Sequence, residues 1–190
     1  MFKLVPLLFA CLMALPSVAL AQDNTLKVGT DCDYAPYSSK DAQGNLVGFE
    51  IDLATEVAKR LGKVPQFVCI AFESAIPALN THQFDVLFDT LSINEERLKQ
   101  VDFTIPYRAD TARFGTKALF DIEPFDSQGK PNLEGLKGKV IGLQAATVYE
   151  NYIAKYFPGI EVKLYDKLPN MYEDLKTGRV DLVIASTSNI

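Results

Sequence analysis

Two hydroxyls, a carboxylate and an arginine are concentrated in the stretch DTLSINEERL. Asp89, Thr90 and Ser92 follow an apolar run that predicts a strand, and Arg97 lies in the first turns of the helix expected next. Ser92 and Glu95 match the capping-box pattern S-x-x-E, which places Ser92 at the N-cap. A helix start offers free N–H groups to an anion, and an arginine adds a bidentate grip on a carboxylate. The stretch therefore predicts either a pocket for a small zwitterion or a capped helix with a solvated arginine.

The stretch LQAATVYENY repeats this arrangement later in the chain. Thr147 and Glu150 form a T-x-x-E pattern, which again places a hydroxyl at a helix start. One such pattern indicates helix initiation and nothing more. Two patterns that face one cleft, with Arg97 beside the first, favour a site for a small anion or zwitterion. Ordinary caps and a surface arginine are the alternative.

Two aromatic side chains and another carboxylate follow the first two predicted strands. Asp31 and Tyr34 belong to the loop DCDYAPYSS, and Phe72 ends the run PQFVCIAF. Tyr34 and Phe72 either stack on the apolar part of a ligand or pack in the core. Asp31 and Asp89 end neighbouring strands, where two carboxylates repel each other unless a cation or hydrogen-bond donors lie between them. A turn-forming role is the alternative for both.

Apolar periodicity places these residues on alternating strands and helices. Strands are expected at 25–31, 65–72, 84–91, 111–119, 139–143, 161–165 and 179–185, and helices at 49–62, 73–82, 147–157 and 168–178. Such alternation predicts parallel pairing in a layered α/β fold, which binds ligands at the carboxyl ends of its strands. The rhythm changes near residues 107–113, so we expect a first lobe at 22–110 and a second at 111–190.

The N-terminal segment MFKLVPLLFACLMALPSVALAQD has the layout of a secretory signal peptide, residues 1–21. A lysine precedes a short apolar run that ends in ALA, and cleavage after Ala21 leaves Gln22 first. A membrane anchor is the alternative, which the two prolines and the short run disfavour. We therefore expect an exported protein.

Export bears on the cysteines. Removal of the leader takes Cys11 and leaves Cys32 and Cys69. An even pair in an oxidising compartment favours a disulfide, and two buried thiols are the alternative. A zinc site is not expected, because these cysteines and His82 lack the paired spacing of zinc ligands.

Charge and composition exclude other classes of protein. The chain has 24 acidic against 19 basic residues, a net charge of -5, and no basic run, so nucleic acid is not an expected partner. An apolar share of 48% is sufficient for a packed core and too high for a disordered chain.

Two long stretches carry a family resemblance. GTDCDYAPYSSKDAQGNLVGFEIDLATEVAKRLG and ESAIPALNTHQFDVLFDTLSINEERLKQVDFTIPY resemble the periplasmic amino-acid-binding proteins of ABC importers. The chain is most similar to the group that takes up lysine, arginine, ornithine and histidine, from about Lys27 onward. The resemblance implies a type II two-lobed periplasmic-binding-protein fold and a monomer in the periplasm. It also implies no cofactor and delivery of the ligand to a permease at the inner membrane.

The resemblance also implies roles for the residues of the two polar stretches. Arg97 matches the arginine that clamps the α-carboxylate of the ligand, assisted by backbone N–H groups at Ser92 and Thr147. Thr90 and Ser92 match positions that receive the α-ammonium group.

The remaining matches concern the side chain of the ligand. Tyr34 and Phe72 match an aromatic pair that sandwiches it, and Asp31 matches a carboxylate that meets a cationic side chain. Gln144 and Tyr149 match second-lobe positions that line the pocket.

Three residues depart from the family pattern. Asp89 stands where relatives usually carry serine or a small residue, which adds negative charge and favours a cationic ligand. Ser186 stands where an aspartate normally pairs with the α-ammonium group, so this contact is expected to be weaker. Ala146 replaces a usual glycine. The sequence also stops at Ile190, before the return to the first lobe that relatives have, so we expect a fragment.

The leading hypothesis is thus a receptor that captures a basic amino acid between two lobes. A neutral polar amino acid or an opine-like conjugate is the alternative ligand. A small-carboxylate dehydratase on the same fold is the alternative function, but it needs a positioned acid or base, and His82 is expected to be solvated. The sensor half of a larger receptor is a third hypothesis.

Overall fold

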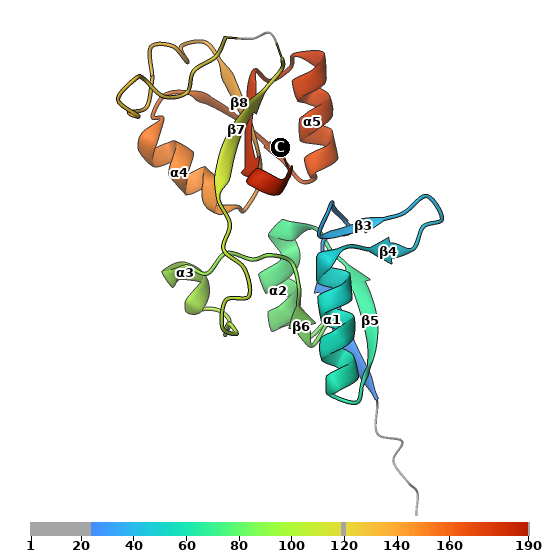
Figure 1. Cartoon of the computed structure of the whole chain (residues 1–190). Coiled ribbons are helices and arrows are strands. Elements are labelled where there is room, and N and C mark those ends of the chain that lie inside the picture. The colour runs from blue at the N-terminus through green and yellow to red at the C-terminus, as the bar shows by residue number, and fades with distance from the viewer. Residues whose placement is uncertain (1–23, 119–120, 190) are drawn as a thin grey trace, which may run out of the picture.

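The computed structural model describes residues 24–118 and 121–189, so the predicted signal peptide, residues 1–21, lies outside the described residues. The described chain forms two lobes, each built on its own sheet (Figure 1). The strands up to residue 87 belong to the first lobe and those from residue 112 onward to the second. Among the described residues, no helix is long and apolar enough to cross a membrane.

The sheet of the first lobe has the order β5-β1-β6 and is parallel throughout. Its strands are β1 (Thr25–Thr30), β5 (Val64–Cys69) and β6 (Val86–Leu87). Helix α1 (Phe49–Arg60) buries Ile51, Ala54 and Ala58, as the 3.6-residue periodicity predicts, but Leu61, expected on the same face, is the exposed C-cap residue. The 3-10 helix η1 (Phe72–Ser74) leads into α2 (Ala75–Asn80) where one helix was predicted.

Strand β6 is shorter than its predicted range of 84–91. One more ladder-like bond follows it, from Phe88 N to Gly29 O at 3.0 Å. The chain then leaves the strand because Thr90 takes a left-handed conformation with φ 44°. The polar residues after β6 therefore lie in a loop that turns toward the second lobe.

A small antiparallel sheet was missed from the sequence. The loop DCDYAPYSS and the residues after it form β2 (Asp33–Tyr34), β3 (Ser38–Lys40) and β4 (Leu46–Val47). Strands this short show no alternation that a pattern could detect. Asp41 supports the β3–β4 turn, where its Oδ1 accepts from Gln43 N at 2.9 Å and Asn45 N at 2.8 Å.

The sheet of the second lobe has the order β7-β10-β8-β9. Its strands are β7 (Ala112–Thr116), β8 (Val140–Gln144), β9 (Glu161–Tyr165) and β10 (Leu182–Ser186). Strands β8, β9 and β10 pair in parallel, as the alternation of strands and helices predicts, whereas β7, which precedes this alternation, runs antiparallel to β10. The reason is that β7 enters this lobe from the connecting segment and does not follow a crossover helix.

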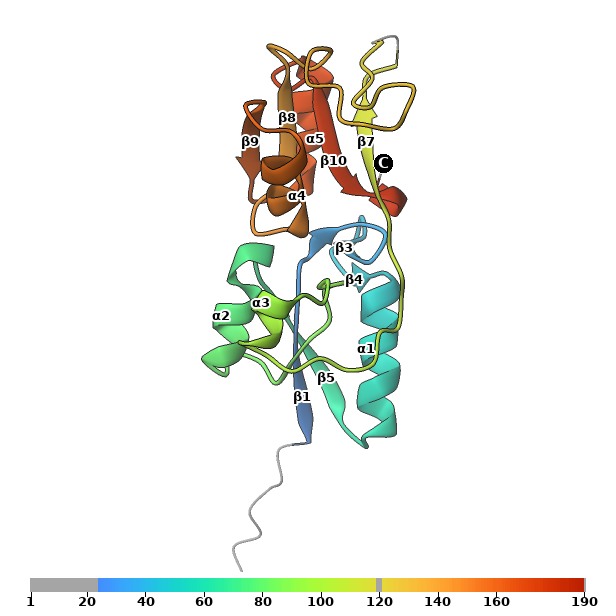
Figure 2. The same cartoon turned by 90° about the vertical axis from the view of Figure 1, so that its left-hand side faces the viewer.

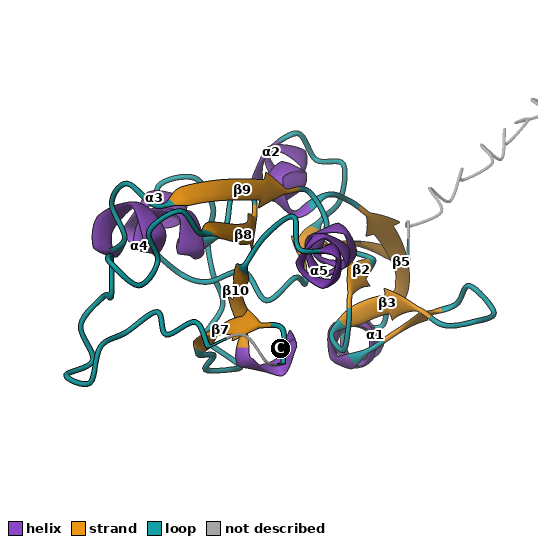
Figure 3. Cartoon of the chain, turned by 90° about the horizontal axis from the view of Figure 1, so that it is seen from above, coloured by secondary structure: helices purple, strands orange, loops and turns teal. Residues whose placement is uncertain are grey.

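Two helices cover opposite faces of this second sheet (Figure 3). Helix α4 (Val148–Tyr156) contributes Ile153 to a core with Leu143 and Ile184, and α5 (Leu168–Thr177) contributes Met171 to a core with Val183. Strand β10 is buried along its whole length because it lies between the two layers.

The two lobes are joined by an extended segment. From the short helix α3 (Glu95–Leu98) the chain runs up one side of the molecule and enters β7 (Figure 2). The 3-10 helix η2 (Thr187–Asn189) follows β10 and returns to the boundary between the lobes. In the first lobe, Cys32 and Cys69 form a disulfide, with their Cα atoms 5.4 Å apart, which ties together the ends of β1 and β5.

Candidate functional site

A cavity of about 40 Å³ lies between the two lobes, at the ends of their strands. Both lobes and the connecting segment contribute to its wall, which consists of Tyr34, Phe72, Thr90, Ser92, Arg97, Asp110, Gln144, Thr147, Val148, Tyr149, Leu168, Ile184, Ala185 and Ser186. Nine of the eleven predicted ligand-binding residues are in this list, and Asp31 and Asp89 are the two that are not. The cavity therefore assembles residues as far apart in sequence as Tyr34 and Ser186, and its volume exceeds that of a water molecule only slightly.

Arg97 is held by helix α3, but the start of this helix differs from the prediction. The N-cap residue is Asn94, whose Oδ1 accepts from Arg97 N at 2.8 Å, so the assignment of Ser92 as N-cap with Glu95 as its partner is wrong. Asparagine caps a helix as well as serine does, and its side chain lies three residues before Arg97. Ser92 acts instead through its backbone, because its carbonyl accepts from Arg97 Nη1 at 2.7 Å.

The guanidinium of Arg97 reaches both lobes. Its Nη2 donates to Ala146 O of the second lobe at 2.9 Å, and its Cζ lies 5.7 Å from the centre of the Phe72 ring in the first. The residue is only 8% exposed. Burial lowers the pKa of Arg97 and the neighbouring Glu96 raises it, and an arginine remains charged after such a shift. The site therefore contains a desolvated cation that faces the cavity.

The loop after β8 forms the second-lobe wall. Thr147 is the N-cap residue of α4, as predicted, but the T-x-x-E box is not formed. Thr147 Oγ1 donates to Gln144 O at 2.7 Å, and Glu150 Oε1 accepts from Ala146 N and not from the N–H of Thr147. The box fails because Ala146 adopts a left-handed conformation with φ 60°, which turns its own N–H toward Glu150. The same turn directs the Ala146 carbonyl toward Arg97.

The two predicted acidic residues lie behind the cavity wall. Asp31 accepts from Gln144 Nε2 at 3.2 Å and from Asp33 N at 2.9 Å. Asp89 Oδ1 accepts from Asp31 N at 3.0 Å, and its Oδ2 has no partner among the described residues. Burial raises the pKa of both carboxyls, that of Asp89 strongly. Asp31 thus acts on the cavity through Gln144, and Asp89 lies deeper in the first lobe.

Three of the predicted aromatic residues line the cavity. Tyr34 and Phe72 both line the cavity, and Tyr34 stacks on Tyr37 with ring centres 5.1 Å apart. Tyr149 faces them from the second lobe, and burial raises its pKa. The phenols are therefore neutral hydrogen-bonding groups at physiological pH.

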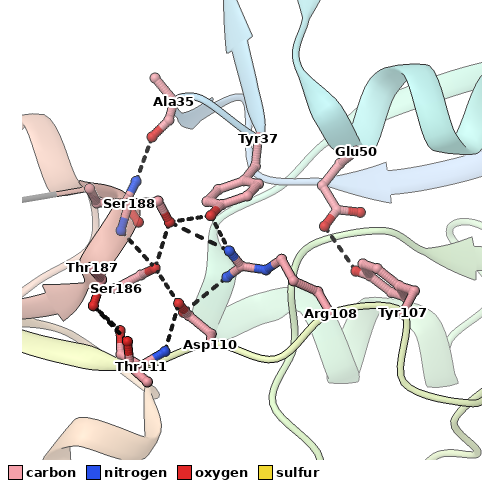
Figure 4. Close-up of polar contacts among 11 residues, drawn as sticks. Ala35, Tyr37, Glu50, Tyr107, Arg108, Asp110, Thr111, Ser186, Thr187 and Ser188 are labelled. Carbon is pink, nitrogen blue, oxygen red and sulfur yellow. Dashed lines mark hydrogen bonds and ion pairs between the residues drawn. The ribbon is translucent and has the colours of Figure 1, made fainter.

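One charged lining residue was missed from the sequence. Asp110 lies in the connecting segment, where its Oδ1 accepts from Ser186 Oγ at 2.8 Å (Figure 4). Its position inside the predicted crossing at residues 107–113 was the available signal, because a segment that joins two lobes must pass the cavity between them. The apolar lining residues Val148, Leu168 and Ile184 carried no signal beyond ordinary core packing.

Comparisons with known proteins show the family of the chain. Residues 26–157 match the family of bacterial extracellular solute-binding proteins, family 3, and the chain belongs to this family. It is 37% identical over 158 residues to the histidine-binding periplasmic protein of Escherichia coli (strain K12), which covers 82% of this chain and 58% of that relative. It is 34% identical over 167 residues to the lysine/arginine/ornithine-binding periplasmic protein of the same organism, covering 86% of this chain and 61% of the relative.

A solved structure gives the same result for the fold. An ancestral arginine-binding protein bound to arginine superimposes with a TM-score of 0.80 at 38% identity, covering 87% of this chain and 71% of that one. The fold is therefore the type II two-lobed fold expected from the sequence. The chain spans less than two thirds of the length of the two E. coli relatives.

Proposed function

We propose that this chain binds a basic amino acid in the cavity between its lobes, in the periplasm, and delivers it as a monomeric receptor to an ABC permease. The observation that carries the proposal is Arg97, a buried cation at the junction of the lobes whose guanidinium bonds carbonyls on both sides. A buried cation needs a counter-charge, and the α-carboxylate of an amino acid supplies one with the bidentate geometry that arginine prefers.

Capture of the ligand requires movement of the lobes. A cavity of about 40 Å³ is too small for an amino acid, so the lobes separate to admit one. The contacts that cross between the lobes and must open include those from Arg97 to Ala146 at 2.9 Å and from Gln144 to Asp31 at 3.2 Å. The ion pair between Lys167 and Asp33 at 2.5 Å must open as well. A ligand that bonds both walls would stabilise the closed arrangement of the lobes. The boundary between the two lobes lies near residue 110.

The preference for a basic side chain is supported by the named relatives and by the first-lobe carboxylates. Asp31 reaches the wall through Gln144, and Tyr34 and Phe72 offer ring faces to an alkyl or guanidinium group. A dehydratase function receives less support, because His82 follows α2 outside the cavity lining.

Thermal unfolding against a panel of amino acids tests this proposal. The panel contains arginine, lysine, ornithine, histidine, glutamine and glutamate, and a ligand at ~100 times its Kd adds about 2.7 kcal/mol to the free energy of unfolding. We expect the largest shift in midpoint with a basic amino acid and its loss in Arg97→Ala. Arg60→Ala removes an equal charge from the exposed end of α1 and should keep the shift. A cooperatively unfolding wild type that shifts with no amino acid contradicts the proposal.

A further inference from the structure

Asp110 has no role in the function derived so far, although it lines the cavity. Among the lining residues that the structure describes, it is the one acidic side chain and Arg97 is the one basic side chain. The two groups come from different segments, Arg97 from α3 and Asp110 from the connection that enters β7. The cavity wall therefore has one charge of each sign, which is the charge pattern that complements a zwitterion.

The carboxylate of Asp110 is firmly oriented. Its Oδ1 accepts from Ser186 Oγ at 2.8 Å and from Thr111 N at 2.9 Å, and its Oδ2 pairs with Arg108 Nη2 at 2.9 Å (Figure 4). An ionised carboxylate accepts roughly four hydrogen bonds, so these three donors leave capacity for about one more on Oδ2. Because Asp110 lines the cavity, a donor bound there can supply this bond.

Arg108 does not occupy that side. Its guanidinium lies over the Tyr37 ring, 4.3 Å from the centre, and it donates to the Tyr37 hydroxyl and, at 3.5 Å, to Ser188 Oγ. It is absent from the cavity lining, whereas Asp110 is part of it. Arg108 thus pairs with the carboxylate without itself lining the cavity (Figure 4).

The charge of Asp110 acts on the cavity. Burial is the main cause that raises the pKa of Tyr34 and of Tyr149, and the Asp110 carboxylate is a further cause at both phenols. Both tyrosines line the cavity from opposite lobes. The Arg108 guanidinium, which pairs with Asp110, lowers the pKa of both phenols, so the role of Asp110 rests on its place in the cavity lining and its remaining acceptor capacity.

We propose that Asp110 accepts the α-ammonium group of the bound amino acid, with Ser186 as the positioning residue beside it. This inference rests on the proposed function. Ser186 stands at the position where the sequence resemblance led us to expect an aspartate, and its hydroxyl is one hydrogen bond from the Asp110 carboxylate. The negative charge that Ser186 lacks is thus supplied from the neighbouring segment, and the ammonium contact does not have to be weak.

Calorimetric titration of Asp110→Asn with two ligands tests this assignment. L-Arginine carries the α-ammonium group, and 5-guanidinopentanoate is the same molecule without it. We expect Asp110→Asn to weaken arginine binding roughly 10- to 100-fold, because a charge-assisted hydrogen bond is replaced by a neutral one. Binding of 5-guanidinopentanoate should be unchanged, which also shows that the variant is folded with its site intact. Should the panel select another amino acid, that compound and its analogue without the α-amino group replace these two.

Two further variants sharpen the test. Ser186→Asp in the Asp110→Asn background returns a carboxylate to the same place and should restore arginine binding. Asp52→Asn removes an equal charge from an exposed position of α1 and should leave both ligands unaffected.

The outcomes separate the inference from the proposed function. Equal weakening of both ligands in Asp110→Asn, or unchanged arginine binding, overturns the role of Asp110 and leaves the receptor function standing. A wild type that binds no amino acid overturns both. If Asp110→Asn unfolds, the double variant decides, because arginine binding that is not restored there contradicts the inference.

Discussion

Each lobe has a buried carboxylate, and the two differ in their hydrogen bonds and in the direction of their pKa shifts. In the second lobe, Asp174 accepts from Lys163 Nζ at 2.6 Å, Arg179 Nη1 at 2.6 Å and Tyr165 OH at 2.8 Å. In the first lobe, Asp89 is 2% exposed and its Oδ2 has no partner among the described residues. The hydrogen bonds lower the pKa of Asp174, and burial strongly raises the pKa of Asp89. The number of donors, and not burial alone, decides which protonation state folding favours.

The contrast extends to the rest of each lobe. Among the described residues, four buried side-chain atoms lack a partner. Those of Thr30, Glu50 and Asp89 lie in the first lobe, and the fourth is Asn189 Oδ1 in η2. The first-lobe core cluster contains Leu26, Val28 and two alanines, with three partly buried apolar residues packed against it, whereas the second lobe has a core on each face of its sheet. The first lobe compensates with the Cys32–Cys69 disulfide. We therefore expect packing to dominate the stability of the second lobe and covalent constraint that of the first.

The largest effect is expected from the second-lobe core. Leu143 is fully buried in β8, and Leu143→Ala should lower the free energy of unfolding by about 2–5 kcal/mol, because a cavity replaces the lost methyl groups. Guanidinium unfolding followed by circular dichroism measures this, and hydrogen exchange should quicken in β8 and β10. Leu164→Ala in β9, where the side chain is 49% exposed, is the matched control and should cost less than about 1 kcal/mol. Equal losses of unfolding free energy in the two variants would contradict the expectation that core packing dominates the stability of the second lobe.

Removal of the disulfide should come next in size. A variant with Cys32→Ala and Cys69→Ala should lose about 2–4 kcal/mol, because the unfolded chain gains the entropy that the bond withheld. Hydrogen exchange should quicken in β1 and β5 and change little in β8. Hydrogen exchange that quickens equally in both lobes would show that the disulfide does not stabilise the first lobe alone.

Asp174→Asn should destabilise the second lobe by a smaller amount that depends on pH. A lowered folded pKa means that the contribution of Asp174 is fully present above its ordinary value of 3.8 and is lost as the pH falls through the folded pKa. The difference between wild type and variant should therefore be constant near pH 7 and shrink in acid. Glu173→Gln, next in sequence and paired only at the surface with Lys176, should show little of this dependence.

Asp89→Asn should change the free energy of unfolding least, and its dependence on pH should have the opposite sign to that of Asp174→Asn. A raised folded pKa means that the unfolded state releases its proton first, so the contribution of Asp89 falls as the pH rises above 3.8 and continues to fall up to the folded pKa. Asparagine keeps the acceptor for Asp31 N and cannot ionise. Unfolding titrations at about pH 4 to 7 should show that the free energy of unfolding of the variant depends less on pH than that of the wild type. A variant less stable than wild type throughout would contradict this explanation.

The elements with strong periodicity were predictable from the sequence, and the local polar geometry was not. Helix α1 and strand β10 have apolar patterns long enough to define both their type and their buried face. The cap of α3 was assigned to Ser92 and belongs to Asn94, because both residues fit the N-cap preference and only the backbone decides between them. Thr90 and Ala146 adopt left-handed conformations that shape both polar loops. Neither residue type favours this conformation, so the sequence does not predict it.

The candidate site shows the same division. Residues in the segments that follow strands, such as Arg97 in α3 and Thr147 at the start of α4, were predictable because the fold brings the strand ends together. Asp110 was missed since it lies in a connection without periodicity, and Asp31 and Asp89 were expected in the cavity because sequence position does not reveal depth of burial. The pairing of Cys32 with Cys69 was left open, and the structure contains the bond.

The Cys32–Cys69 bond also bears on how the protein matures. It joins the ends of β1 and β5, which are followed directly by the segments that carry Tyr34 and Phe72 into the cavity. Preparations made in a reducing cytosol and in an oxidising compartment would then differ in mass only by the thiol hydrogens, yet differ in how well their binding walls are ordered. Sample history would be a variable in every affinity measured on this chain.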